Sequence, residues 1–176
     1  MFCPRFNHFR RIMSDGSVGL CGHMIGSQHF STYNDLQNSQ WLSILQSSDG
    51  WAPECIRCKQ EEEIGNKSIR QHAIDRHKFL SKQNNDYLII GGILDNICNS
   101  ACQFCNENLS TKIGSLKFGK NYTTINNYDK FLEFPQEKII ELDINGGEPS
   151  NSPNYKKLLE NLPSNLKILR INTNCS

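Results

Sequence analysis

The sequence contains no hydrophobic run of about 20 residues, the length that a membrane-spanning helix needs. It also lacks an excess of charge of either sign, because 19 Lys and Arg residues face 18 Asp and Glu residues and the net charge is +1. A charge this small gives no electrostatic reason to expect nucleic acid or a membrane as the main partner. Residues 1–5 lack the apolar core of a signal peptide, so we expect a cytoplasmic protein.

Cysteine, in contrast, is abundant, with 8 in 176 residues. Because the cytoplasm keeps thiols reduced, we expect these cysteines to bind metal rather than to form disulfides. The alternative is a secreted disulfide framework, which the missing signal segment disfavours. All of the cysteines except Cys175 fall into two groups by their spacing.

The first group follows an apolar run at residues 87–94, which predicts a buried strand. Cys98, Cys102 and Cys105 come next, spaced four and then three residues apart. Thiolates are soft ligands that suit iron–sulfur clusters, zinc or copper(I). A structural zinc site usually needs four protein ligands, whereas a four-iron cluster held by three thiolates leaves one iron open for a substrate or cofactor. The alternative is that the three cysteines are small hydrophobic residues on one helix face.

This spacing, with Phe104 directly before the last cysteine, resembles the cluster loop of the radical S-adenosylmethionine (radical SAM) superfamily. The resemblance implies that Cys98, Cys102 and Cys105 hold a 4Fe-4S cluster whose open iron binds S-adenosylmethionine through its amino and carboxylate groups. An electron from a flavodoxin- or ferredoxin-like protein then cleaves the cofactor, and the 5′-deoxyadenosyl radical takes a hydrogen atom from the substrate. Relatives often act on peptides or proteins, so a peptide is the expected substrate class.

A second motif follows the apolar run at residues 138–145 and consists of Gly146, Gly147, Glu148 and Pro149. Glycines at the carboxyl end of a strand let a ligand approach the backbone, and in barrels that end carries the active site. The four residues match the Gly-Gly-Glu-Pro motif of radical SAM proteins, which binds the amino group of the cofactor. The resemblance therefore assigns cofactor binding to Phe104 and residues 146–149, and residues 172–174 lie where relatives also line the pocket. A simple turn is the alternative.

The second group of cysteines lies in residues 1–85 and provides four thiols, enough to close a metal site. Its members are Cys3, Cys21, Cys55 and Cys58. With Glu62, Gly65, Ser68 and Arg70, this order resembles the auxiliary-cluster segment of twitch- or SPASM-type radical SAM proteins. The resemblance implies a second iron–sulfur cluster, and zinc is the alternative because four thiolates suit it equally. Relatives often carry paired cysteines where this chain has Cys21-Gly22, so His8 or His23 is an alternative ligand.

The order of elements predicts an α/β fold in which a small cysteine-rich α+β module, residues 1–85, precedes the start of a TIM-like radical SAM barrel, residues 86–176. We expect about three parallel strands in the second part, at residues 87–94, 138–145 and 166–172. Helices are expected at residues 34–46, 67–82, 126–134 and 154–161. Asp15-Gly16 predicts a hairpin in the first part.

Two polar residues in the second strand, Glu141 and Asp143, alternate with apolar neighbours. One face of this strand therefore meets something polar, and we expect both carboxylates to point into a barrel lumen opposite Arg170. The alternative is an edge strand with a wet face.

The resemblance implies a barrel with more strand–helix units than this chain contains. We therefore expect a fragment or a truncated reading frame with an open sheet edge after the third strand, in which cluster binding survives while turnover is poor. The alternative function is a non-catalytic interaction module that zinc or a cluster stabilises.

Overall fold

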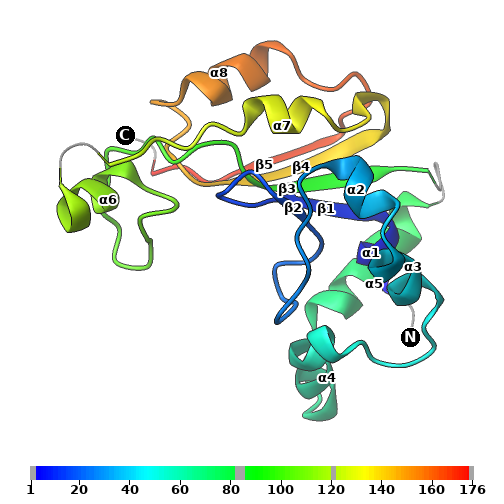
Figure 1. The fold of residues 1–176 in the computed structure, drawn as a ribbon. Coiled ribbons are helices and arrows are strands. Elements are labelled where there is room, and N and C mark those ends of the chain that lie inside the picture. Colours follow the sequence, from blue (N-terminus) through cyan, green and yellow to red (C-terminus); the bar gives the residue numbers. More distant parts are fainter. Residues whose placement is uncertain (1–2, 82–85, 120–121, 175–176) are drawn as a thin grey trace.

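The computed structural model describes residues 3–81, 86–119 and 122–174. The fold is α/β, with a five-stranded sheet in the order β2-β1-β3-β4-β5 (Figure 1). The strands are β1 (Phe9–Ile12), β2 (Val18–Gly19), β3 (Leu88–Ile93), β4 (Ile139–Asn145) and β5 (Ile168–Ile171). Strands β1, β3, β4 and β5 run parallel, and β2 pairs antiparallel with β1.

The three parallel strands expected after residue 86 are confirmed as β3, β4 and β5, but the parallel part of the sheet also contains a fourth strand that was not expected. The fourth is β1, which comes from the cysteine-rich first part and pairs with β3, Phe9 opposite Ile89. Strand β1 also forms the predicted hairpin with β2, in which Asp15 Oδ1 accepts a hydrogen bond from the Ser17 amide at 2.9 Å. Within the described residues the sheet is open, with β2 and β5 at its edges, so the expected edge after the third strand is present.

Eight α-helices and two short 3-10 helices connect the strands in the described residues. The α-helices are α1 (Pro4–His8), α2 (Tyr33–Gln37), α3 (Gln40–Ser47), α4 (Ile56–Glu63), α5 (Ile69–Leu80), α6 (Thr111–Phe118), α7 (Tyr128–Leu132) and α8 (Pro153–Glu160), and the 3-10 helices are η1 (Pro53–Cys55) and η2 (Gln136–Lys138).

Three of the four expected helices are confirmed as α5, α7 and α8, whereas the one expected at residues 34–46 is two helices. The chain breaks between α2 and α3 because Ser39, with extended backbone, caps α3 by accepting a hydrogen bond from the Leu42 amide. None of the helices in the described ranges has the length and hydrophobicity of a membrane-spanning segment.

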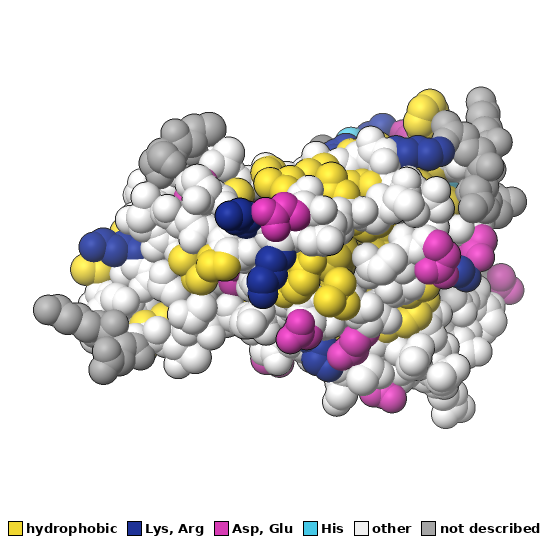
Figure 2. Space-filling model, turned by 90° about the horizontal axis from the view of Figure 1, so that it is seen from above, with side chains coloured by type: hydrophobic (Ala, Val, Ile, Leu, Met, Phe, Trp, Pro, Cys, Tyr) yellow, Lys and Arg dark blue, Asp and Glu magenta, His cyan; other side chains and the backbone are white. Residues whose placement is uncertain are grey.

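Helices α7 and α8 cover one face of the sheet, and α4 and α5 lie on its other side (Figure 1). The core lies between the sheet and the first pair of helices, where Leu142 of β4, Phe131 of α7 and Leu158 of α8 are each 0% exposed. Burial of such side chains stabilises the fold by about 1.5–3 kcal/mol each. Seen from above, the α7–α8 face also carries hydrophobic side chains in contact with solvent, and Leu132 and Leu159 are half-exposed (Figure 2).

Candidate metal sites

The structure brings the four cysteines of the first part to one small cavity of about 20 Å³. Pro4 begins α1 and so turns the chain between Cys3 and β1, and Cys21 lies two residues after the end of β2. Cys55 ends η1, and Cys58 lies in the first turn of α4. Such a volume holds about one water-sized sphere. A single ion would therefore fit with less movement of the cavity walls than a four-iron cluster would need.

Burial shapes the chemistry of these thiols. It raises the pKa of Cys3 to about 11 and that of Cys55 to about 12, and it also raises the pKa of Cys58. The neighbouring cysteines add to these shifts, because one thiolate repels the next. Cys3, Cys55 and Cys58 therefore stay protonated unless a cation among them compensates the charge, which is what a bound metal ion would do.

A polar junction between α4 and α5 holds Cys58 in place. Glu62 accepts hydrogen bonds from Ser68 Oγ at 2.5 Å and from Arg70 Nε at 2.9 Å. Ser68 also caps α5 in a capping box with Gln71, and Gly65 makes the turn with a φ of 80°. The four residues that were matched above only by resemblance thus have a structural role beside the thiol cavity. They are Glu62, Gly65, Ser68 and Arg70.

The thiols share a cavity, but no three Cys, His, Asp or Glu side chains in the described residues form a ready metal-binding group. Metal binding at this site would therefore require side-chain rotation. Of the two histidines considered as ligands, His23 lines the thiol cavity and His8 does not. His23 Nδ1 is buried and has no hydrogen-bond partner among the described residues, and burial lowers its pKa, so the neutral imidazole is a further donor.

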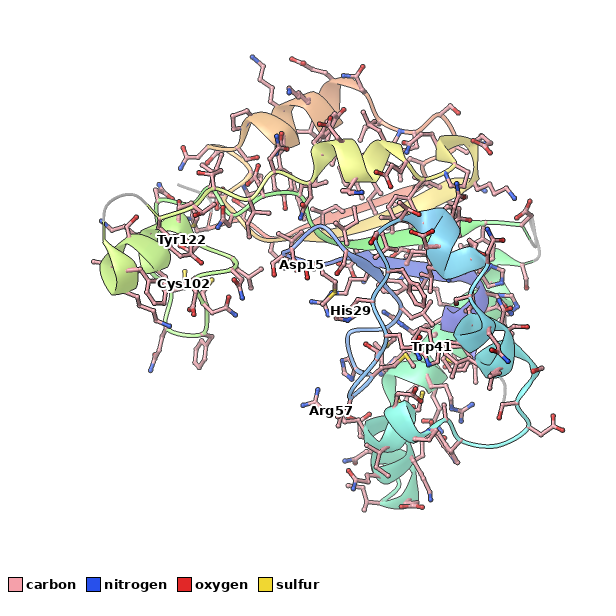
Figure 3. All side chains as sticks on the ribbon, viewed as in Figure 1. Asp15, His29, Trp41, Arg57, Cys102 and Tyr122 are labelled. Carbon is pink, nitrogen blue, oxygen red and sulfur yellow. The ribbon has the colours of Figure 1, made fainter. Side chains whose placement is uncertain are left out.

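The second candidate site is the loop between β3 and α6, which carries Cys98, Cys102 and Cys105. Figure 3 shows Cys102 on this loop at the left of the molecule, well apart from Trp41 and Arg57. Cys98 and Cys105 are half-buried, and Cys102 is exposed. Burial raises the pKa of Cys105, and the charges of Cys98 and Cys102 raise it further. These three side chains do not form a ready metal-binding group in the described part of the chain. Phe104, expected to contact the cofactor, is 97% exposed.

Two buried residues that the sequence analysis missed anchor this loop at the end of β3. Asp95 accepts hydrogen bonds from the Ile97 amide at 3.1 Å and from Ser152 Oγ, and burial raises its pKa. Asn96 accepts one from the Ile125 amide at 2.8 Å. An Asp-Asn pair directly after a buried strand was the available signal, but the same pair also marks ordinary turns.

The loop is also fixed at its other end, where α6 begins. Ser110 Oγ donates a hydrogen bond to the Ser100 carbonyl at 2.7 Å. Thr111 Oγ1 accepts one from the Cys98 amide at 3.2 Å. The cysteine loop is therefore exposed at its tip and held at both ends.

Gly146 and Gly147 follow β4 with φ values of 87° and 67°, which favour glycine. A Cβ on Gly147 would meet Asp95 Oδ1 at 2.5 Å and the Ile97 carbonyl at 3.0 Å. The close approach that these glycines permit is thus to the base of the cysteine loop.

Glu148 is 1% exposed, and the protein itself satisfies its carboxylate. Oε1 accepts a hydrogen bond from Thr173 Oγ1 at 2.6 Å, and Oε2 accepts one from the Asn174 amide at 2.7 Å. Burial raises the pKa of Glu148, but hydrogen bonds from Asn174, Thr173 and Ser150 outweigh it and leave the pKa below its ordinary value. A cofactor ammonium group could reach this carboxylate only by displacing one of these donors.

Asn174 also donates hydrogen bonds to Asn99 Oδ1 at 3.2 Å and to Ser100 Oγ at 2.6 Å. The predicted residues after β3, β4 and β5 therefore meet at the carboxyl edge of the parallel sheet, as expected for a site in an α/β fold. Glu141 and Asp143 line a cavity together with Arg170 on one face of the open sheet, and the barrel lumen expected there stays a prediction. Cys175 lies outside the described residues.

In comparisons with known proteins, no family model, no curated protein and no solved structure matches the chain. The chemistry of the two cysteine sites is therefore the basis for any functional conclusion.

Proposed function

We propose that the chain is a radical SAM enzyme, or part of one, in which Cys98, Cys102 and Cys105 hold a 4Fe-4S cluster. The observation that supports this most is the meeting of the cysteine loop, residues 146–149 and residues 172–174 at one edge of the parallel sheet. The resemblance joins the same three segments around one cofactor, and a partial TIM-like barrel is part of this proposal.

The protein's own residues give this site position and access. Asp95, Asn96 and Ser110 fix the ends of the loop, so that its three cysteines stay on one anchored segment with an exposed tip. When bound, the cluster and S-adenosylmethionine supply a 5′-deoxyadenosyl radical that takes a hydrogen atom from the substrate. The exposed Cys102 leaves the loop open to a flavodoxin- or ferredoxin-like electron donor. The substrate class proposed is a peptide or protein.

Anaerobic reconstitution with iron and sulfide tests the cluster. We expect about four iron and four sulfide ions to be lost when Cys98, Cys102 and Cys105 are all changed to Ala. The Cys175→Ala variant, which changes a cysteine outside both groups, should keep them. Addition of S-adenosylmethionine should change the electron paramagnetic resonance spectrum of the reduced protein. Equal iron contents in the triple variant and the control would refute the proposal.

The second candidate function is a non-catalytic module that metal stabilises, and the small four-cysteine cavity favours it. Three buried thiols and the half-buried Cys55 around space for one ion suit zinc, which binds four thiolates tetrahedrally. Metal analysis of the protein purified without added iron distinguishes the two possibilities for this cavity. Zinc that is lost on Cys55→Ser and Cys58→Ser substitution would assign it to zinc, and iron with sulfide would assign it to an auxiliary cluster.

A further inference from the structure

A second cavity of about 360 Å³ lies between α5 and the face of the sheet turned away from α7 and α8. This volume is within the range of about 300–1,000 Å³ that small-molecule sites occupy. Arg5 and Ile69 line both this cavity and the four-cysteine cavity, so the two cavities share a wall. We call it the arginine cavity, because Arg5, Arg76 and Arg170 all line it.

The arginine cavity carries an excess of positive charge. Three guanidinium groups and the two carboxylates of Glu141 and Asp143 line it. With the histidines counted as neutral, the lining has one positive charge in excess. Glu141, whose side chain is 3% exposed, forms ion pairs with Arg76 and with Arg170, the latter at 3.5 Å. One buried carboxylate therefore holds two guanidinium groups in place without neutralising both.

Two of the arginines have unused hydrogen-bonding capacity. The Nε atoms of Arg5 and Arg76 are buried and have no hydrogen-bond partner within the described residues. Arg5 is fixed by stacking over the Phe9 ring, 3.6 Å from its centroid. A buried donor without an acceptor is unfavourable, and a bound acceptor would satisfy it.

The remaining wall is largely aromatic, and its rings contact one another. His8 stacks on Tyr87 with ring centroids 4.0 Å apart, and His77 Nδ1 bonds the Tyr87 hydroxyl at 2.7 Å. His8 Nδ1 donates to the Tyr87 carbonyl at 3.0 Å, so the ring has a fixed orientation. A pocket with fixed walls and oriented guanidinium groups loses little entropy when it binds a ligand.

We propose that the arginine cavity is a binding site for a small oxyanion, either a carboxylate or a phosphate group. Guanidinium groups bind both kinds of oxyanion through paired hydrogen bonds, and Arg76 and Arg170 approach the cavity from two different elements. Nothing in this inference depends on metal at either cysteine site, so its failure would leave the proposed function untouched.

Isothermal titration calorimetry of the full chain with inorganic phosphate and, separately, with succinate tests the site. We expect saturable binding of at least one probe with one site per chain, and the probe that binds identifies the oxyanion class. The affinity for the probe should fall at least about tenfold in the Arg170→Gln variant. The same loss is expected in a double variant that combines Arg76→Gln with Glu141→Gln. Both partners of the ion pair are changed together there so that no buried charge is left unpaired. Arg170 has a side chain that is 55% exposed, so its substitution is not expected to unfold the protein.

The matched control is Lys78→Gln, which removes a positive charge from α5 at a side chain that is 71% exposed and outside the cavity. This variant should bind the probe as the unchanged protein does. The proposal is overturned if neither probe saturates, if the two cavity variants bind normally, or if Lys78→Gln weakens binding as much as they do.

Discussion

At the scale of single residues, Gly147 ties the Gly-Gly-Glu-Pro segment to the cysteine loop through its lack of a side chain. Its φ of +67° already disfavours other residues, and a Cβ would also meet Asp95 Oδ1 at 2.5 Å. We expect Gly147→Ala to lower the free energy of unfolding by about 3 kcal/mol or more, because backbone strain and a clash with a buried carboxylate add. Urea denaturation measures the loss.

Gly26→Ala is the control for this substitution. Gly26 has nearly the same φ, +68°, but no described atom lies within 4 Å of its added Cβ. Only the cost of the left-handed backbone, about 1–2 kcal/mol, should appear there. Equal losses in the two variants would mean that the contact between Gly147 and the base of the cysteine loop has no energetic weight.

At the scale of elements, the junction between α4 and α5 depends on the charge of Glu62. The hydrogen bond from Arg70 and that from Ser68 lower the pKa of Glu62, while burial acts in the opposite direction. A carboxyl group whose pKa is lowered in the folded state contributes its full stabilisation at any pH above its ordinary pKa of about 4.3. This contribution is lost as the pH falls through the pKa of the group in the folded protein. We expect Glu62→Gln to cost about 2 kcal/mol at neutral pH and progressively less below about pH 4.

Urea denaturation of both proteins across this pH range checks the prediction. The neighbouring Glu63→Gln is the control, because Glu63 is 60% exposed and its ion pair with Lys59 is 3.7 Å long. A surface pair of this kind contributes about 0–1 kcal/mol. A cost for Glu62→Gln that does not change with pH would show that packing, and not charge, holds the junction.

The elements themselves were predictable to different degrees, for physical reasons. The alternation around Leu142 and Ile144 identified β4, because a strand with one buried face must repeat every two residues. Strand β1 was recognisable only as half of a hairpin. Arg10 lies within it yet is 1% exposed, since its guanidinium group donates to the Phe6 and Phe9 carbonyls. Periodicity cannot anticipate a buried charge that the local backbone satisfies.

The candidate sites show the same division. Spacing and resemblance placed Cys3, Cys21, Cys55 and Cys58 in one group, and these four line one cavity. The grouping of the three loop cysteines around one cluster stays a prediction. Arg76, Asp95 and Asn96 were not identified, since their roles depend on partners far away in the sequence, such as Glu141 and Ile125. Such partners follow from the topology of the sheet and not from any local pattern.

At the scale of the whole molecule, β1 links the cysteine-rich first part to the rest of the sheet because it is an inner strand. Ile12 of β1 is 0% exposed in the core, and β1 lies between β2 and β3. We therefore expect residues 1–85 and 86–176 to unfold as one cooperative unit. Ile12→Ala should cost about 2–5 kcal/mol and shift every probe of unfolding together.

The two tryptophans, Trp41 and Trp51, both lie in the first part, so their fluorescence reports on that part, whereas far-ultraviolet circular dichroism reports on the whole chain. The midpoints from the two probes should coincide in the unchanged protein and move equally in Ile12→Ala. Ile64→Ala, at a side chain that is 75% exposed, should move neither. If Ile12→Ala shifted the fluorescence midpoint alone, the two parts would be independent folding units, and β1 would add pairing to the sheet without coupling their stability.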